Sequence, residues 1–401
     1  MAVDSWMPPA LRLRRPPIDG GANLLRILQS PASHIPDSLL HEQQITVPAG
    51  RRTLRMISDP GLAFAILNAR EDMFAQIPLV TRVLSEGLAK PAHDDEPKTR
   101  ARCLAIKTSI PEAERMALVA ALAARIGSEW REAGDSPVDL LGDCRRLTLD
   151  ALWRAFFGRG PAAGESDPDV DLAARTITAQ SADAPMVDRL EALEPLAVRY
   201  VRETAPELAP SDEDYPFILG VLLVMLDAGH DNSAPTLAWM LWLLAHRPDL
   251  QQTIREEGAG ATSEAVLLEV LRLYPPIPTV TRRAMKDFTF GNERIAKGED
   301  ILISLYAMHR HRDHWAEADA FRPERFLSGR RRVLRSQDML PFGAGPRGCI
   351  GTAFAQRALT TITATLLSQV ELRPNPDAGF ACSTNFALRP VGRDTVFARA
   401  I

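Results

Sequence analysis

The feature that most limits how this 401-residue chain can fold is a long apolar stretch with one polar interruption. The apolar runs FILGVLLVML (217–226) and APTLAWMLWLLA (234–245) flank the polar segment DAGHDNS (227–233). A membrane-spanning helix needs about 20 consecutive apolar residues, and the polar segment divides the run near its centre. A helix that is apolar on nearly all sides, with one polar patch halfway, is typical of the core of a large soluble protein. The pattern therefore predicts a buried helix over 216–246 and no membrane anchor.

The rest of the sequence predicts a mainly α fold with a small β part. Apolar residues recur at helical spacing across most of 55–275, and several of these segments begin with Ser, Thr or Asp, which cap helices. The segment 279–310 instead alternates apolar and polar residues around Gly and Asn turns, as short strands do. Helical spacing returns over 349–370, and the end of the chain, 386–400, predicts a hairpin.

Charge and cysteine usage exclude several classes of protein. Lys and Arg number 47 and Asp and Glu 51, so the net charge of −4 gives no general reason to expect nucleic acid or an anionic membrane as a partner. The four cysteines form no CxxC pair in a chain too large to need disulfides, so we expect a reducing, cytoplasmic setting. With no repeat or linker, we expect a single domain over 1–401, in which 1–20 is an irregular lead-in without the apolar run of a signal peptide.

The segment FGAGPRGCIG (342–351) allows two interpretations. Gly343, Gly345 and Gly348 have the GxGxxG spacing of a dinucleotide-binding loop. Such a loop needs a buried strand that runs into its first glycine, whereas the residues before Gly343 are charged and broken by Pro341. A nucleotide-binding dehydrogenase is therefore the weaker interpretation.

The second interpretation takes Cys349 as the functional residue. Glycines make a tight loop, and a cysteine that opens a helix experiences the dipole and free N–H groups that favour a thiolate. A thiolate held in this way is a metal ligand, and haem-thiolate enzymes are a known example of cysteine as the axial ligand of haem iron. The alternative is an inert buried thiol.

Four segments, taken together, resemble the cytochrome P450 family. The loop matches the family's cysteine loop through the pattern Phe342-Gly343-x-Gly345-x-Arg347-x-Cys349-x-Gly351. EVLR (269–272) is similar to the ExxR helix, FRPERF (321–326) to the meander motif and AGHDNS (228–233) to the oxygen-groove helix. The resemblance is strong over about 216–400. In the first half of the chain it rests only on the helical spacing of apolar residues and on one weaker motif. It implies the cytochrome P450 fold and haem b bound through Cys349 in a soluble, bacterial-type monooxygenase.

The resemblance also assigns roles on the cysteine side. Glu269 and Arg272 can meet on one helix face, and the family joins such a pair to Arg325 in a buried ion network; alone, they would be a surface pair. The haem-binding residues implied by the family are Lys98, Arg102, Arg282, Arg347, Phe342, Gly343 and Ala228. The family commonly has His or Trp where this chain has Lys98, so that role is a departure from the pattern. The alternative for Lys98 and Arg102 is a solvated basic helix face.

In the oxygen groove the family usually reads Ala or Gly, Gly, any residue, acid, then Thr. This chain supplies Ala228, Gly229, His230, Asp231 and Asn232. Gly229 leaves the backbone open to small molecules, and Asp231 is the acid that feeds protons to the site. Asn232 replaces the threonine: it either holds a water or the substrate, or it bonds back to a helix carbonyl and has no catalytic role. His230 is expected to be a packed neighbour rather than a ligand.

The remaining expectations concern substrate and partners. Ile277, Val280, Phe386 and the loop 73–84 are apolar and correspond to the family's pocket, which favours a small, mostly apolar substrate; alternatively, they are core residues. Electrons are expected from a ferredoxin-type donor and its NAD(P)H-dependent reductase, docked on a basic cluster that includes Arg100, Lys107 and Arg357. The protein is expected to be a monomer. Rival functions are a P450-fold enzyme that uses peroxide or catalyses a rearrangement, and a catalytically silent haem-binding protein.

Overall fold

The computed structural model describes residues 8–10, 34–49, 52–77, 96–105, 110–134, 136–162, 165–180, 186–327, 337–383 and 388–401. Most of the expected lead-in, Lys107, Phe386 and the larger part of the loop 73–84 lie outside these ranges. The chain divides into two compact units. The sheet unit comprises Met1–Val83, Leu268–Ile350 and Ala381–Arg389, and the helical unit comprises Leu84–Leu267, Gly351–Phe380 and Pro390–Ile401.

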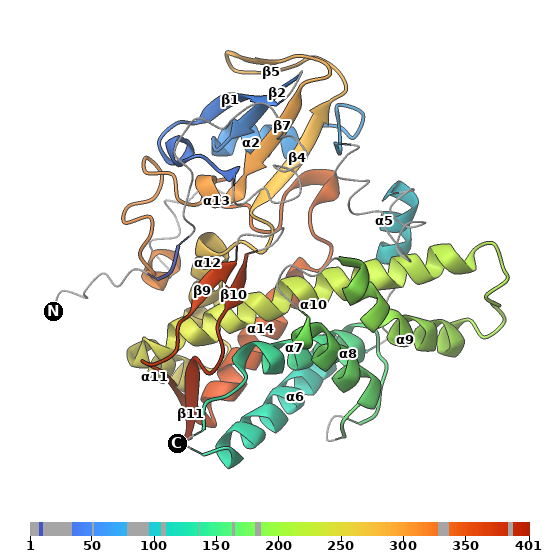
Figure 1. The fold of residues 1–401 in the computed structure, drawn as a ribbon, viewed down its shortest axis with the longest axis vertical. Helices are drawn as coiled ribbons and strands as arrows, with labels where there is room; N and C mark the ends of the chain where they lie inside the picture. Colours follow the sequence, from blue (N-terminus) through green and yellow to red (C-terminus); the bar gives the residue numbers. More distant parts are fainter. Residues whose placement is uncertain are drawn as a thin grey trace. The chain divides into compact units, whose positions relative to one another are not determined.

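The sheet unit is built on a five-stranded sheet in the order β1-β2-β7-β4-β3 (Figure 1). Its strands are β1 (Gln44–Ala49), β2 (Arg52–Ile57), β3 (Phe74–Ala75), β4 (Thr279–Ala284) and β7 (Asp300–Ser304). Only β2 and β7 run parallel, and the other neighbouring pairs are antiparallel. Every residue of β7 is buried, since this strand has a neighbour on each side and α2 (Pro60–Asn68) packs its Leu62 and Ile66 against Ile301 and Ile303.

The other elements of this unit are short. They are η2 (Asp37–Leu40), β5 (Phe288–Phe290), β6 (Glu293–Ile295), α13 (Leu305–Met308), η5 (Pro323–Phe326), η7 (Gly345–Arg347), β9 (Ala381–Ser383) and β10 (Arg389–Val391), which ends in the helical unit. β5 with β6 and β9 with β10 form separate two-stranded sheets. The helix α12 (Ala261–Leu273) enters the sheet unit at Leu268.

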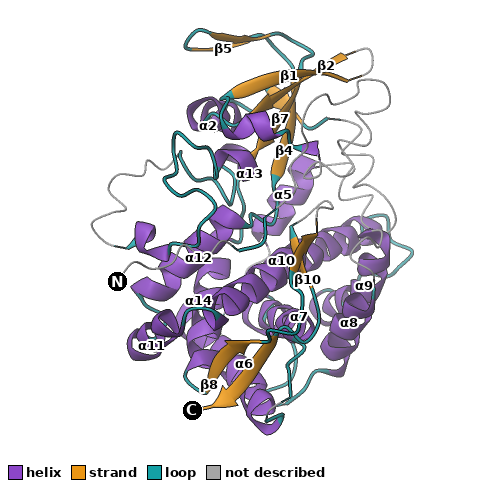
Figure 2. Cartoon of the chain, turned by 60° about the vertical axis from the view of Figure 1, so that its left-hand side comes forward, coloured by secondary structure: helices purple, strands orange, loops and turns teal. Residues whose placement is uncertain are grey.

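The helical unit surrounds α10 (Tyr215–Ala245), which is 31 residues long. The other elements are α5 (Glu96–Ala105), α6 (Glu112–Glu132), α7 (Leu140–Ala151), the π-helical turn η4 (Leu152–Phe156), α8 (Pro168–Ala179), α9 (Met186–Thr204), α11 (Pro248–Glu257), α14 (Thr352–Leu367), β8 (Val370–Pro374) and β11 (Val396–Ala400). Helices α7, α9 and α14 pack directly against α10, and α6 and α8 pack against α7 (Figure 2). In the described residues no helix is long and apolar enough to cross a membrane.

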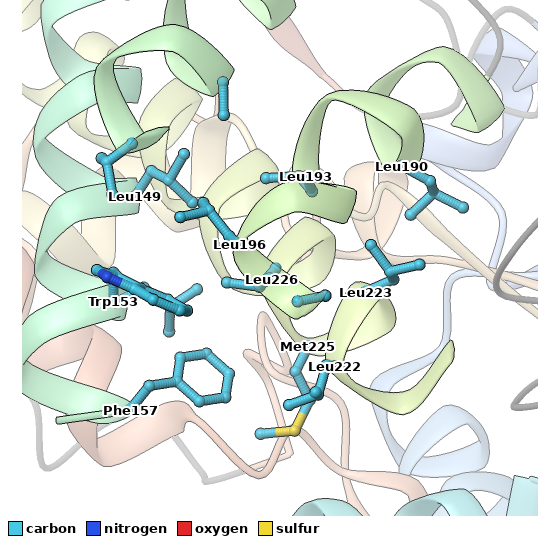
Figure 3. Packing of buried hydrophobic residues seen from close by; sticks show 14 of the residues in the cluster. Leu149, Trp153, Phe157, Leu190, Leu193, Leu196, Leu222, Leu223, Met225 and Leu226 are labelled. Carbon is cyan, nitrogen blue, oxygen red and sulfur yellow. The ribbon is translucent and has the colours of Figure 1, made fainter. Parts of the chain in front are cut away.

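The core of the helical unit explains why α10 is apolar on almost all sides. Trp153 and Phe157 face Leu222, Met225 and Leu226 of α10, while leucines of α9 close the cluster from another side (Figure 3). Farther along, Trp239 has 0% of its surface exposed. The prediction of a long buried helix over 216–246 and that of a mainly α fold with a small β part are therefore confirmed.

The predicted terminal hairpin is wrong. β11 pairs antiparallel with β8, from Val396 opposite Pro374 to Ala400 opposite Val370, rather than with the strand that precedes it. The inward residues Val396 and Ala398 are fully buried, as are Val370 and Leu372 of β8. The apolar pairing of β11 with β8 is thus favoured over a hairpin closed by the turn that precedes β11.

Candidate functional site

The cysteine loop lies in the sheet unit and is folded by three backbone hydrogen bonds. The amide of Gly343 donates to Leu340 O at 3.0 Å, and the amide of Gly348 donates to Gly345 O at 2.9 Å. The amide of Cys349 donates back to Phe342 O at 2.9 Å. The side chain of Cys349 is exposed. The loop therefore fixes the backbone on both sides of a thiol that another group can reach.

Two glycines are required by the geometry of this loop. Gly343 and Gly345 both have φ 68°, in the left-handed region that favours glycine. At Gly345, a Cβ atom would also lie 2.2 Å from Leu67 O, so no side chain fits. Residues 337–341 before the loop are turns and irregular backbone rather than a strand. The loop thus lacks the strand that a dinucleotide-binding fingerprint needs.

Glu269 and Arg272 form a buried pair, with 0% of either side chain exposed. Arg272 Nε and Nη2 each donate to the Glu269 carboxylate at 2.8 Å. The remaining N–H groups donate to backbone carbonyls at 2.6–3.0 Å, namely those of His309, Ala318 and Ala320. The structure therefore places the two residues in a closed ion network and not on the surface.

Arg325 completes this network. Its Nε lies 3.2 Å from Glu269 Oε2, and the backbone amide of Arg322 donates to Glu269 Oε1 at 2.8 Å. Burial lowers the pKa of Arg325, the charge of Glu269 opposes that change, and the charge of Arg272 adds to it. The Glu269 carboxylate thus links Arg272 on α12 to the Arg325 guanidinium and the Arg322 amide in the segment 321–326.

His309 is a residue that sequence reasoning missed. Its ring is fully buried, and Nε2 accepts a hydrogen bond of 3.0 Å from the amide of Leu340, where the cysteine loop begins. Its own carbonyl accepts from Arg272 Nη1. No periodicity or motif indicated this contact, because it joins residues 31 positions apart through the folded chain.

Two arginines expected near a cofactor lie in the sheet unit. Arg282 on β4 is buried and donates to Thr281 O at 2.8 Å, and Arg347 is half-buried and donates to Phe74 O at 3.1 Å. The half-buried Phe342 and Gly343 belong to the same unit. One thiol with two guanidinium groups is a donor set that fits a haem, which needs an axial ligand and cationic partners for its propionates.

Of the expected pocket residues, Ile277 and Val280 are half-buried in the sheet unit. Val280 packs against the apolar cluster of α2, β4 and β7, so its position also fits the core interpretation. Phe386, the third predicted residue, lies outside the described residues.

Lys98 and Arg102 lie on α5 in the helical unit. Lys98 Nζ is 3.9 Å from Asp214 Oδ1 and 4.2 Å from the ring centroid of Phe217, at the beginning of α10. Arg102 lines a cavity of about 190 Å³ whose walls include Tyr200 and Thr204 of α9. The four cationic residues expected to bind the cofactor are therefore divided between the two units.

The oxygen-groove residues lie in the middle of α10, which passes through Pro235 without a break. Ala228 is exposed and Asn232 partly so. Asn232 Nδ2 donates to Ala228 O at 2.8 Å, one turn earlier on the same helix. This is the back-bonded arrangement that the sequence left open as the alternative to a catalytic amide.

Gly229 has a packing role in the structure. A Cβ atom at this position would lie 2.7 Å from Leu152 Cδ2 in the π-helical turn η4. The glycine thus lets α10 approach η4, in addition to any role in opening the backbone to small molecules.

Asp231 is buried and ion-paired. Arg189 Nη2 on α9 lies 3.5 Å from Asp231 Oδ2. The same guanidinium holds Asp227 more closely, with Nε 2.9 Å from Oδ1 and Nη2 3.4 Å from Oδ2. Burial alone would lower the pKa of Arg189, but the charges of Asp227 and Asp231 outweigh it and raise that pKa. Sequence reasoning missed Arg189, since nothing in α9 distinguishes it from a surface arginine.

His230 is a packed neighbour in the structure. It is fully buried, and neither ring nitrogen has a hydrogen-bond partner among the described residues. Burial lowers its pKa, although the nearby charges of Asp231 and Asp227 act in the opposite direction. A neutral ring therefore fills this part of the helical unit.

Comparison with known proteins decides the family. The model of the family described as Cytochrome P450 matches residues 214–392. The chain belongs to the cytochrome P450 family. Putative cytochrome P450 137 of Mycobacterium tuberculosis is 32% identical over 230 residues, which are 57% of this chain and 45% of that protein. The taurochenodeoxycholic 6 alpha-hydroxylase of Sus scrofa is 34% identical over 166 residues, or 37% of this chain and 32% of the relative. The matched region thus spans less than half the length of these relatives.

Solved P450 structures match over almost the whole chain. CYP175A1 from Thermus thermophilus has a TM-score of 0.71 at 25% identity and covers 96% of this chain and 100% of its own. A six-coordinated cytochrome P450 from another strain of the same species has a TM-score of 0.65 at 27% identity, with 86% and 92% covered. The cytochrome P450 fold extends through the first half of the chain, where sequence motifs were weak, and the family implies a haem-iron cofactor.

Proposed function

We propose that this P450 is a haem-thiolate monooxygenase that inserts one oxygen atom from O₂ into a small, mostly apolar organic substrate. The observation that carries the proposal is the cysteine loop, in which an exposed thiol follows two obligatory glycines and its own amide is fixed on Phe342 O. A loop held in this way presents a thiolate to a metal with little freedom to move. Bound haem b would supply oxygen activation, and the Cys349 thiolate would hold it.

The residues around the cofactor divide into two groups of different chemistry. Arg282 and Arg347 would neutralise the haem propionates, and Lys98 and Arg102 would add cations from α5. Phe342, Gly343 and Ala228 offer surfaces of low polarity to the macrocycle. We also propose that the chain acts as a single functional domain.

Asp231 would deliver protons during oxygen activation. A carboxyl group that passes protons must change partners, and its bond to Arg189 is longer than that guanidinium's contact with Asp227. The longer contact supports a role for Asp231 in passing protons. Asn232 has one amide hydrogen bond to Ala228 O, so its carboxamide oxygen is the group that would accept a bond from water or substrate.

Electrons would come from a ferredoxin-type protein and its NAD(P)H-dependent reductase. The basic residues Arg100 on α5 and Arg357 on α14 belong to the helical unit, where Arg357 also forms an ion pair with Glu112. An acidic donor would dock on such a surface through complementary charge, so the reduction rate should fall as salt is added. We further propose that the protein is a cytoplasmic monomer.

The test is the absorption spectrum of the reduced carbon monoxide complex of the purified, haem-loaded protein. A thiolate-type band in the parent and its loss in Cys349→Ala are expected. A parent spectrum without that band would overturn the haem-thiolate assignment. Ligands that shift the haem spin state then define the substrate class, and product formation with a ferredoxin system tests the monooxygenase activity.

A second candidate is peroxide-driven oxidation without O₂ activation. This candidate is favoured by the hydrogen bond from Asn232 Nδ2 to Ala228 O. The bond uses the side-chain amide of Asn232 at the position where the family usually has a threonine hydroxyl. Such an enzyme would not need Asp231. Product formed from hydrogen peroxide at the same rate by the parent and by Asp231→Asn, with none from O₂ and reductant, would establish this candidate over the first.

A further inference from the structure

The buried ion network and the cysteine loop are connected through one imidazole. His309 follows α13, and its amide donates to Leu305 O at 2.9 Å, so the helical turn fixes its backbone. Arg272 Nη1 donates to His309 O at 3.0 Å, which ties the same residue to the ion network. The ring then accepts the amide of Leu340 on Nε2 at 3.0 Å.

The bond to Leu340 continues into the loop. Leu340 O accepts the amide of Gly343 at 3.0 Å, and the next carbonyl but one, Phe342 O, accepts the amide of Cys349 at 2.9 Å. Displacement of Leu340 would therefore change the start of the turn against which Cys349 is fixed. Leu340 itself has 5% of its surface exposed, so water cannot readily replace the imidazole as acceptor.

The chemistry of the ring fits a permanent acceptor. An imidazole accepts on Nε2 only when it is neutral and carries its proton on Nδ1. Burial lowers the pKa of His309 to about 3, and the positive charges of Arg272 and Arg310 act in the same direction. The ring is consequently neutral throughout the physiological range.

We propose that His309 is a positioning residue for the haem-thiolate site: its Nε2 holds the Leu340 amide and so sets the position of the Cys349 thiolate relative to the haem iron. This inference rests on the proposed function, because it assumes that Cys349 would hold the haem. The contacts themselves all lie within the sheet unit.

Two substitutions separate positioning from filling of the core. His309→Gln keeps an acceptor close to the place of Nε2, whereas His309→Leu retains a buried side chain of similar size but leaves the Leu340 amide without an acceptor. His311→Leu is the matched control, since His311 is also fully buried and its Nδ1 accepts from the nearby Asp313 amide, at 3.3 Å, rather than from the cysteine loop.

The experiment has two readouts on the haem-loaded proteins. One is the fraction of the reduced carbon monoxide complex that shows the thiolate-type band, and the other is amide hydrogen exchange at Gly343 and Cys349. In His309→Leu we expect the ratio of thiolate-type to other species to fall, and exchange to accelerate, by about tenfold each, as expected for an orphaned buried amide. His309→Gln and His311→Leu should stay within about twofold of the parent.

Parent-like values in His309→Leu would overturn the proposal, as would equal damage in His309→Gln and His309→Leu. If His309→Leu does not fold, His309→Gln alone decides: retention of the thiolate-type band and slow exchange supports the role, and their loss refutes it. A parent without the thiolate-type band would refute the proposed function instead, while the exchange comparison would still show whether His309 orders the loop.

Discussion

Two buried ion clusters in this P450 differ in the hydrogen bonds and ion contacts that their central arginine makes. In the sheet unit, all five N–H groups of Arg272 are bonded, two of them to Glu269 and the others to backbone carbonyls. In the helical unit, Arg189 is shared between Asp227 and Asp231, with contacts that lengthen from 2.9 to 3.5 Å. In the first cluster every N–H group of the cation is used, which suits a scaffold. In the second cluster one guanidinium is divided between two carboxylates, which suits the proton delivery proposed for Asp231.

The largest effect should come from breaking the closed cluster. Glu269→Ala leaves Arg272 and Arg325 without their shared carboxylate, so we expect the free energy of unfolding to fall by about 3–5 kcal/mol and haem incorporation to be lost. Chemical denaturation and the haem content of the purified protein measure both outcomes. Glu371→Ala removes an exposed pair with Arg373 and should change stability by less than about 0.5 kcal/mol. A haem-replete Glu269→Ala protein would contradict the scaffold role.

A smaller effect on the same unit is expected from Gly345→Ala. The added Cβ would overlap Leu67 O in a backbone with φ 68°, which we expect to cost about 2–3 kcal/mol and to move the cysteine loop. Gly291→Ala is the matched control, since Gly291 has φ 58° but no atom of the described residues lies within 4 Å of the place that its Cβ would occupy. The difference between the two variants in thermal unfolding isolates the steric part, and equal losses would mean that backbone strain alone matters.

The open cluster should respond less strongly, and in a pH-dependent way. Arg189→Gln leaves Asp227 and Asp231 buried one helical turn apart, so we expect a loss of about 1–3 kcal/mol at neutral pH. Without the guanidinium, the pKa of this pair of carboxyls should rise above the value of about 3.9 found for unfolded Asp. The folded variant then binds protons more tightly than the unfolded chain, so its deficit should shrink as the pH falls from 7 towards 5.

Urea denaturation of Arg189→Gln and the parent at both pH values measures that deficit. Arg247→Gln is the control, because Asp249, the partner of Arg247, is largely exposed. The control deficit should not vary over this range. A deficit in Arg189→Gln that also stays constant would show that the two carboxylates do not interact strongly.

The sequence could predict the parts of these clusters that depend on short spacing. Glu269 and Arg272 are three residues apart on one helix, and the apolar runs of α10 show helical spacing over many turns. The sequence could therefore predict both the pair and the helix. Arg189 and His309 were not, because each meets its partners through elements that only the folded chain brings together. The pairing of β11 with β8 was missed for the same reason. The π-helical turn that places Leu152 against Gly229 has no sequence signal of its own.

The smallest structural effect, and the sharpest functional test of the helical unit, is Asn232→Ala. The bond from Asn232 Nδ2 goes to Ala228 O, a carbonyl that already accepts a backbone hydrogen bond within the helix. Its loss should therefore change the free energy of unfolding by less than about 0.5 kcal/mol. If the carboxamide oxygen helps Asp231 to deliver protons, product formed per electron should fall by about 2–10-fold, and Asn232→Thr, which restores a hydroxyl, should keep the parent value. Unchanged coupling in Asn232→Ala would make this residue a local feature of the helix and would leave Asp231 as the only residue of this segment proposed to deliver protons.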